Sequence, residues 1–145
     1  VPPGQAPALL AGDFSGMPGP DQLRAGPGWP HADTTHALRF IEQGGATWLI
    51  ALDGTVIGEA GTKAPPDADG RVEIGYGLAP GSRGRGLGTG AVRALVAELW
   101  RQPGVRALDA EVAVDNVASR RLLERLGFQR VAGSSEFDRF ELTPS

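Results

Sequence analysis

The chain contains 145 residues, of which 41% are hydrophobic, and its formal net charge is −3. This length and hydrophobic share predict one domain with an ordinary core rather than a disordered chain. The sequence has no cysteine, which excludes disulfides, thiol nucleophiles and metal sites built on cysteine. His31 and His36 are the two histidines, and their spacing is poor for one helical face, so we expect no metal site.

Glycine and proline are frequent, with 22 and 12 residues, about twice their combined average share. Seven prolines and six glycines fall within residues 1–30, and a further six glycines lie from Gly77 to Gly90. We therefore divide the chain into a Pro/Gly-rich N-terminal segment, residues 1–30, and a folded domain, residues 31–145. The second glycine cluster indicates a functional loop.

The charge and hydropathy patterns limit the partners and the location. A net charge of −3 argues against general binding to a nucleic-acid backbone, which requires an excess of basic residues. The most apolar stretch, Ala46–Leu52, is too short to span a membrane, and no signal peptide opens the sequence. Arginine far outnumbers lysine, as in high-GC genomes. We expect a bacterial, cytoplasmic protein that binds neither nucleic acid nor membrane.

The periodicity of apolar residues and the turn formers predict the elements. Asp53–Gly54 between two apolar runs is a hairpin signal, and the later helices begin near capping candidates, Asp33 or Thr34 and then Asp115 or Asn116. The result is an α+β fold, a mixed sheet with helices on its faces. In chain order we predict a short helix near 21–24, a helix over 34–43, strands over 46–52, 55–62 and 71–79, a helix over 87–101, a strand over 107–114, a helix over 116–126, and strands over 128–132 and 137–142.

The turn Arg83–Gly90 lies between a predicted strand and a predicted helix, so its backbone can approach an anion at a helix start. A Walker-type loop is excluded, because Leu87–Gly88 stands where Lys and Ser or Thr are required. The dinucleotide pattern matches from Gly86 to Ala91, but too few residues follow for a doubly wound sheet. A flexible turn that eases packing and a pyrophosphate loop of the form Arg-x-x-Gly-x-Gly remain open.

Three segments resemble the GNAT superfamily of acetyltransferases, and most closely its ribosomal-protein N-terminal (RimJ/RimL-like) branch. They are Glu73–Pro80, which reads EIGYGLAP, the loop Arg83–Gly88, which reads RGRGLG, and Asn116–Phe128, which contains NVAS and ends in LGF. The resemblance covers about residues 46–132. It implies a GNAT fold, a twisted mixed sheet of about six to seven strands that splays at the cofactor site, flanked by about four helices.

The resemblance also implies acetyl-CoA as co-substrate. Pantetheine would run beside the strand end, the loop amides would hold the pyrophosphate, and the Asn of the third segment would contact pantetheine or substrate. The implied cofactor-binding residues are Tyr76, Leu78, Arg83, Gly84, Arg85, Gly86, Leu87, Gly88, Thr89 and Asn116.

Two residues are candidates for the chemistry by the same resemblance. Glu73 occupies the strand position where several relatives carry a base, and Ser119 the position of the group proposed to protonate the leaving sulfur. Many relatives use a tyrosine as the acid where this sequence has Leu123, and Tyr76 is a weaker alternative acid. An exposed strand Glu and a helix-start Ser bonding local backbone are the corresponding structural interpretations.

The sequence gives less information about the acceptor site than about the cofactor site. The family's first strand is at best a remnant at Ala8–Gly12, and residues 1–30 hold at most a degenerate first strand and helix. Trp29 and His31 are candidates to line the acceptor site. We expect an N-acetyltransferase, monomer or homodimer, acting on a primary amine of a protein N-terminus or a small molecule. The alternatives are a catalytically silent acyl-CoA-binding or regulatory module and a transferase that uses another acyl-CoA, such as succinyl-CoA.

Overall fold

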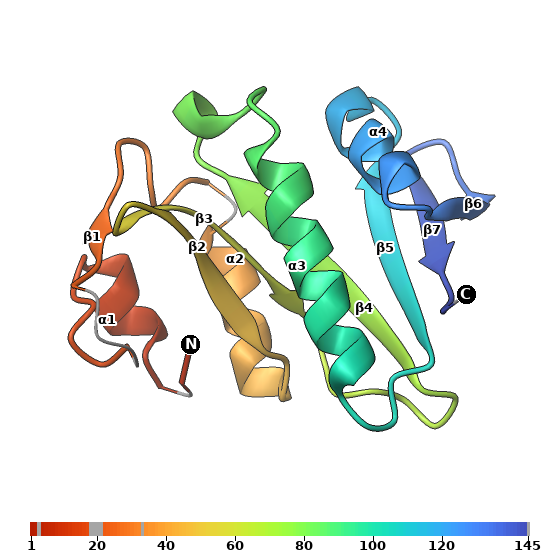
Figure 1. Cartoon of the computed structure of the whole chain (residues 1–145), viewed down its shortest axis with the longest axis horizontal. Helices are drawn as coiled ribbons and strands as arrows, with labels where there is room; N and C mark the ends of the chain where they lie inside the picture. The colour runs from red at the N-terminus through yellow and green to blue at the C-terminus, as the bar shows by residue number, and fades with distance from the viewer. Residues whose placement is uncertain (3, 18–21, 33, 145) are drawn as a thin grey trace.

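The computed structural model describes residues 1–2, 4–17, 22–32 and 34–144, and its centre is one mixed sheet of seven strands. The strand order is β1-β3-β4-β5-β7-β6, with β2 paired to β3 in addition (Figure 1). β4 and β5 run parallel, and the other pairs are antiparallel except β1 with β3. The strands are β1 (Arg24–Ala25), β2 (Thr47–Leu52), β3 (Thr55–Thr62), β4 (Arg71–Leu78), β5 (Ala107–Ala113), β6 (Gln129–Gly133) and β7 (Phe137–Leu142).

Helices cover the two faces of the sheet, and each face has its own core. Strand residues such as Ile74 and Leu108 pack with Val92 and Leu123 from α3 and α4. On the other face, Leu38 of α2 belongs to a second cluster that includes N-terminal side chains. Figure 1 shows α3 and α4 on the near side of the sheet and α2 behind it. The helices are α1 (Ala6–Leu10), α2 (Thr34–Arg39), η1 (Phe40–Gln43), η2 (Pro80–Ser82), α3 (Leu87–Arg101) and α4 (Val117–Arg125).

The predicted fold class is confirmed, and the later element boundaries agree to within one or two residues. The hairpin forms, with Asp53 and Gly54 both at positive φ in its turn. Asn116 caps α4, since its side-chain oxygen accepts a hydrogen bond from the Ser119 N–H at 3.2 Å. Asp33, the other capping candidate for α2, lies outside the described residues.

The N-terminal predictions need two corrections. Ala8–Gly12 is not a strand remnant, because residues 6–10 form α1, with Pro7 in the first turn where a missing N–H costs little. The prediction of a short helix near 21–24 is wrong for Arg24. This residue and Ala25 form β1, which pairs with Thr55 and Val56 of β3. Asp21 lies outside the described residues. Arg24 and Ala25 form a strand because they pair with β3, which is distant in the chain, and no local sequence pattern indicates that pairing.

The sheet splays between β4 and β5, as the resemblance implied. Their pairing ends at Ile74 with Ala110, whereas β4 stays paired with β3 as far as Leu78. β5 continues past the split on its other edge, paired with β7 as far as Ala113. The two strands therefore part over the second half of β4, and Figure 1 shows their ends diverging.

Candidate active site

Tyr76 and Ser119 meet across the split. Tyr76 lies on the part of β4 that has left β5, and its hydroxyl bonds the hydroxyl of Ser119 in the first turn of α4. Burial raises the pKa of the Tyr76 hydroxyl above its usual range, and the bond with Ser119 offsets part of that rise. Tyr76 therefore stays protonated at neutral pH. The pair places two O–H groups where the strands separate.

The glycine-rich loop leads from the open end of β4 into α3. Gly84 and Gly86 have φ of +79° and +74°, a region that side chains disfavour, and Gly86 directly precedes the helix. The first N–H groups of α3 have no partner within the helix, so they can bind an anion. Gly88 packs closely against the helix and strand, because a β-carbon there would lie 3.3 Å from Leu122 and 3.4 Å from Leu78 and would require these side chains to shift slightly.

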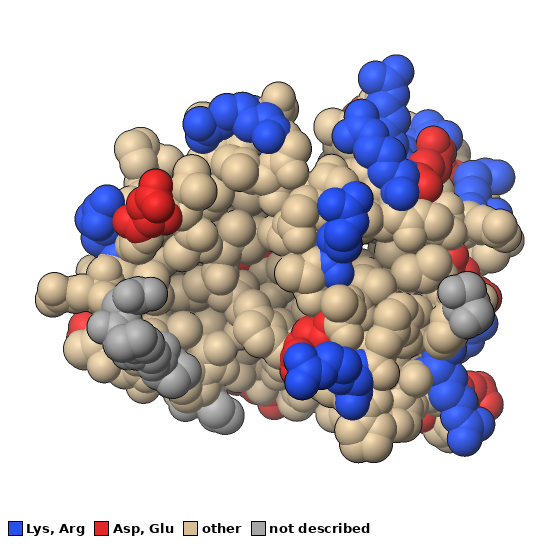
Figure 2. Space-filling view, viewed as in Figure 1, with Lys and Arg blue, Asp and Glu red and all other residues tan. Residues whose placement is uncertain are grey.

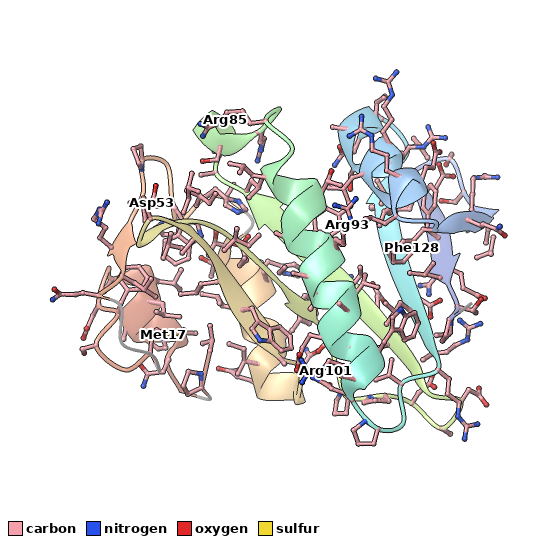
Figure 3. All side chains as sticks on the ribbon, viewed as in Figure 1. Met17, Asp53, Arg85, Arg93, Arg101 and Phe128 are labelled. Atoms are coloured by element: carbon pink, nitrogen blue, oxygen red, sulfur yellow. The ribbon has the colours of Figure 1, made fainter. Side chains whose placement is uncertain are left out.

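Basic side chains lie on both sides of the open end of the split. Figure 2 shows Lys and Arg side chains on each side of the indentation at the top of the molecule. Arg85 stands at the loop and Arg93 on the side of α3 toward α4, whereas Arg101 is at the far end of the helix (Figure 3). All three are exposed. These charges and the α3 N-terminus make this end suitable for phosphate groups.

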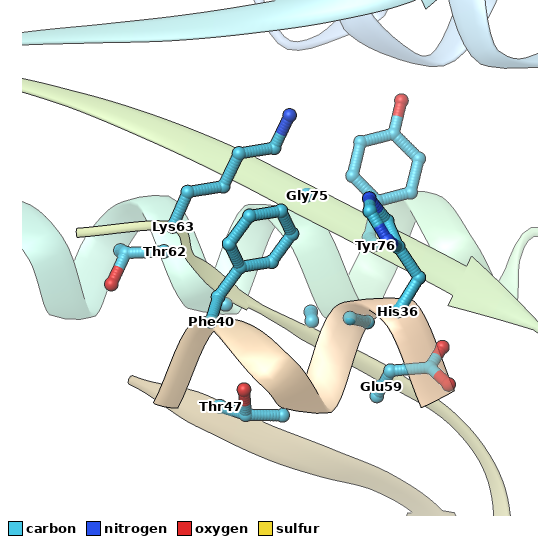
Figure 4. A pocket seen from close by; sticks show the side chains of 11 residues that line it. His36, Phe40, Thr47, Glu59, Thr62, Lys63, Gly75 and Tyr76 are labelled. Atoms are coloured by element: carbon cyan, nitrogen blue, oxygen red, sulfur yellow. The ribbon is translucent and has the colours of Figure 1, made fainter. Parts of the chain in front are cut away.

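A pocket of about 220 Å³ lies between α2 and the strands β3 and β4. Phe40 stacks edge-on with His36, and the Lys63 ammonium lies 5.4 Å from the Phe40 ring. Tyr76 also lines the pocket, so one side chain connects it with α4 (Figure 4). The lining residues are His36, Ala37, Phe40, Thr47, Glu59, Ala60, Gly61, Thr62, Lys63, Gly75 and Tyr76.

Glu59 is a buried carboxylate in this pocket. Its side chain is 1% exposed, and its Oε2 lies 2.9 Å from Nε2 of His31, which is 5% exposed. Its Oε1 has no hydrogen-bond partner among the described residues. The pair packs over Gly77, since a β-carbon there would lie 3.0 Å from Oε2 of Glu59 and 2.9 Å from the His31 ring. Buried carboxylates normally have all their oxygens satisfied, so Glu59 is a candidate for binding a ligand.

Glu73 pairs with Asp109, one position before the pairing of β4 with β5 ends. Its carboxylate forms an ion pair with the Lys63 ammonium, and its side chain is 27% exposed. Glu73 therefore meets the pocket through Lys63, which lines it. Asp109 in turn bonds Arg71 at 2.8 Å, and burial raises its pKa although Arg71 and Arg139 lower it.

The remaining predicted site residues are placed as follows. Trp29 is 4% exposed and packs against Phe14 with ring centroids 5.8 Å apart, so it is a core residue outside the pocket lining. His31 reaches the pocket through Glu59. The side-chain oxygen of Asn116 is used to cap α4. Arg83 donates from Nε to the Leu78 carbonyl at 3.0 Å, which fixes the loop to the end of β4.

Glu59 is the residue that the sequence patterns did not single out. The sequence nevertheless contained one indication of this residue. Glu59 is the lone charged residue in the strand Thr55–Thr62, which otherwise consists of apolar residues, glycine and threonine. Every residue from Val56 to Thr62 is buried, so this charge could not reach solvent. A lone acidic residue in a buried strand is therefore a usable indication of a site.

A family model described as an acetyltransferase (GNAT) domain matches residues 11–129. N-acetyltransferase YjdG of Bacillus subtilis is 26% identical over 120 residues, which cover 75% of this chain and 71% of YjdG. N-acetyltransferase YoaA of the same organism is 33% identical over 98 residues, covering 66% of this chain and 55% of YoaA. The chain thus spans between about half and three quarters of the length of these relatives.

Solved structures agree with the family model. Aminoglycoside acetyltransferase AAC(6')-Ib in complex with coenzyme A has a TM-score of 0.63 at 25% identity, covering 77% of this chain and 75% of that one. The ribosomal L7/L12 alpha-N-protein acetyltransferase RimL, also with coenzyme A, has a TM-score of 0.66 at 18% identity, covering 77% and 71%. Across the described residues, no helix has the length and apolar character to cross a membrane. The chain belongs to the GNAT acetyltransferase family and is an N-acetyltransferase domain of that family.

Proposed function

We propose that the chain transfers the acetyl group of acetyl-CoA directly to a primary amine. One arrangement supports this: the split between β4 and β5 has the glycine-rich start of α3 at its open end and the Glu59 pocket beside it. The pyrophosphate would bind the loop Arg83–Thr89, and the pantetheine would follow β4 near Tyr76 and Leu78 toward the pocket. Structural neighbours have been solved with coenzyme A or acetyl-CoA.

The reaction requires a neutral amine, stabilisation of the developing oxyanion and a proton for the sulfur. The amine nitrogen attacks the thioester carbonyl, a C–N bond forms, and the C–S bond breaks. The thiolate takes a proton from the Tyr76–Ser119 pair, whose two hydroxyls are bonded to each other. We assign Glu73 as the base that removes the proton from the amine, directly or through water. The ion pair with Lys63 uses Oε2 of Glu73, so we assign Oε1 to take the proton.

The acceptor class is a protein N-terminus or a small-molecule amine. An α-amine has an ordinary pKa of about 7.7–8.0 and is partly neutral at pH 7, whereas a lysine side chain at about 10.4 needs more help from a base. Among the neighbours, RimL is described as an acetyltransferase of ribosomal L7/L12, and AAC(6')-Ib has been solved with ribostamycin. Both acceptor types therefore belong in the test panel.

Calorimetric titration with acetyl-CoA and an assay of CoA release with peptides, amino acids, polyamines and aminoglycosides test the proposal. We expect acetyl-CoA to bind and at least one amine to increase CoA release above hydrolysis. Tight binding without turnover on any amine would favour a catalytically silent acyl-CoA-binding module. Turnover with succinyl-CoA only would instead favour another acyl donor.

Glu73→Gln tests the base. We expect kcat to fall by about 10²-fold, the usual contribution of a general base, while the Kd for acetyl-CoA stays unchanged. Glu98→Gln, which removes a half-buried carboxylate paired with Arg101 on α3, is the matched control and should keep its rate. An unchanged rate in Glu73→Gln would rule out this assignment but leave the transferase proposal in place.

A further inference from the structure

We propose that Glu59, held in place by His31, binds the ammonium group of the acceptor, so that the acceptor enters the pocket as a compact cationic amine. This inference rests on the proposed function and deepens it. It names the group that recognises the acceptor and the chemical class of the acceptor. The two residues come from distant parts of the chain, since His31 precedes α2 and Glu59 lies on β3.

The unsatisfied oxygen of Glu59 is the first argument. The carboxylate is 1% exposed, and His31 contacts Oε2 at 2.9 Å, while Oε1 has no partner within the described part of the chain. A carboxylate has acceptor sites on both oxygens, and leaving one empty in a buried position is unfavourable. An ammonium group carries three donors and a positive charge, so it satisfies Oε1 better than a neutral ligand.

The composition of the pocket is the second argument. Among the described residues that line it, Glu59 is the one acidic side chain, and the Lys63 ammonium is already paired with Glu73. Within the pocket lining, the carboxylate of Glu59 thus has no ion-pair partner. Phe40 and His36 place aromatic rings in the lining, and Figure 4 shows His36 between Phe40 and Glu59. Aromatic faces beside a carboxylate suit a cation with an apolar stem.

The size and position of the pocket are the third argument. Its volume of about 220 Å³ fits a compact amine or the amine-bearing end of a larger molecule. Oε2 of Glu59 would lie 3.0 Å from a β-carbon on Gly77, which belongs to the half of β4 that has parted from β5. An ammonium on Glu59 is therefore held against the strand along which the thioester would pass.

The experiment compares propylammonium chloride with 1-propanol, its neutral analogue, on the full chain at constant ionic strength. The chain has two histidines, so imidazole proton NMR signals, assigned with a His36→Asn variant, report on His31 separately. We expect propylammonium to shift the His31 signal with a Kd at least about tenfold lower than that of 1-propanol, the usual gain from a charged hydrogen bond. In Glu59→Gln this preference should shrink to about twofold or less.

Glu111→Gln is the matched control, because it removes an exposed carboxylate of β5 outside the pocket lining and should keep the preference. Equal binding of the two probes by the wild-type chain would overturn the proposal, and this comparison needs no variant to fold. Retention of the preference in a folded Glu59→Gln variant would also overturn it. Failure of acetyl-CoA binding or turnover, with the preference intact, would count against the proposed transferase function alone.

Discussion

The hydroxyl of Tyr76, on β4, bonds the hydroxyl of Ser119, in the first turn of α4, across the split in the sheet. This contact links the strand that the cofactor would follow to the helix on the opposite side of the split. Tyr76 also lines the acceptor pocket, so the pair lies between the two proposed ligands. Two hydroxyls in contact can pass a proton from one to the other.

The losses of kcat in Tyr76→Phe and Ser119→Ala should therefore be non-additive when the two substitutions are combined. We expect each single variant to lower kcat by about 10²-fold, the low end for a general acid, because a thiolate is a tolerable leaving group. The double variant should lose little more than either single one, since residues that act as a unit are not additive. Steady-state kcat of all four proteins measures this. Independent, multiplicative losses would contradict a shared proton path.

Arg85→Ala should weaken acetyl-CoA binding, because this exposed side chain stands at the glycine-rich loop beside the start of α3 (Figure 3). We expect an increase in Kd of about 3- to 30-fold, typical of one charged hydrogen bond, and a smaller dependence of Kd on salt. Arg101→Ala, at the opposite end of the same helix, is the control and should bind as the wild type does. Equal effects of the two variants would indicate a general charge effect instead of a loop contact.

Gly77→Ala should disturb the Glu59–His31 pair. The new β-carbon would lie within 3.0 Å of both side chains, so they must move. We expect a loss of about 1–3 kcal/mol in the free energy of unfolding and a higher KM for the amine. Gly75→Ala is a close control on the same strand and face, because a β-carbon there meets only Lys63, at 3.8 Å. Its free energy of unfolding should stay within about 0.5 kcal/mol of the wild type. Similar losses in both variants would argue against a specific contact at residue 77.

The pH dependence of stability should change in Asp109→Asn. Burial raises the pKa of Asp109, so the folded protein binds this proton more tightly than the unfolded chain does. The contribution of this carboxyl to the free energy of unfolding therefore decreases as the pH rises from its unfolded pKa through its folded pKa, and is constant above. The variant lacks this term, so its stability relative to the wild type should increase as the pH rises through that window. Urea unfolding of both proteins between pH 3.5 and pH 7 measures it, and a relative decrease would show the opposite sign of the pKa shift.

The sequence by itself determined the order and type of most elements and the place of the glycine-rich loop. The hairpin around Asp53–Gly54, the helix that follows the glycine-rich turn and the start of α4 at the Asn116 cap all depend on local rules. Turn chemistry and apolar periodicity act over a few residues, so one chain is enough to read them. The resemblance of the three motifs then indicated the family, which the family model confirmed.

Only the tertiary structure decided the surroundings of each polar side chain. Lys63 pairs with Glu73 because a loop and a strand return to the same face, and His31 meets Glu59 because the chain before α2 folds over Gly77. The split between β4 and β5 brings Tyr76 to Ser119. Leu9, Phe14 and Trp29 join a core that includes Leu38, although the segment they come from is rich in glycine and proline. The His31–Glu59 and Tyr76–Ser119 contacts join residues 28 and 43 positions apart, and Lys63 meets Glu73 only because β3 and β4 pair. The free energy that forms these contacts therefore comes from tertiary burial and strand pairing rather than local preference.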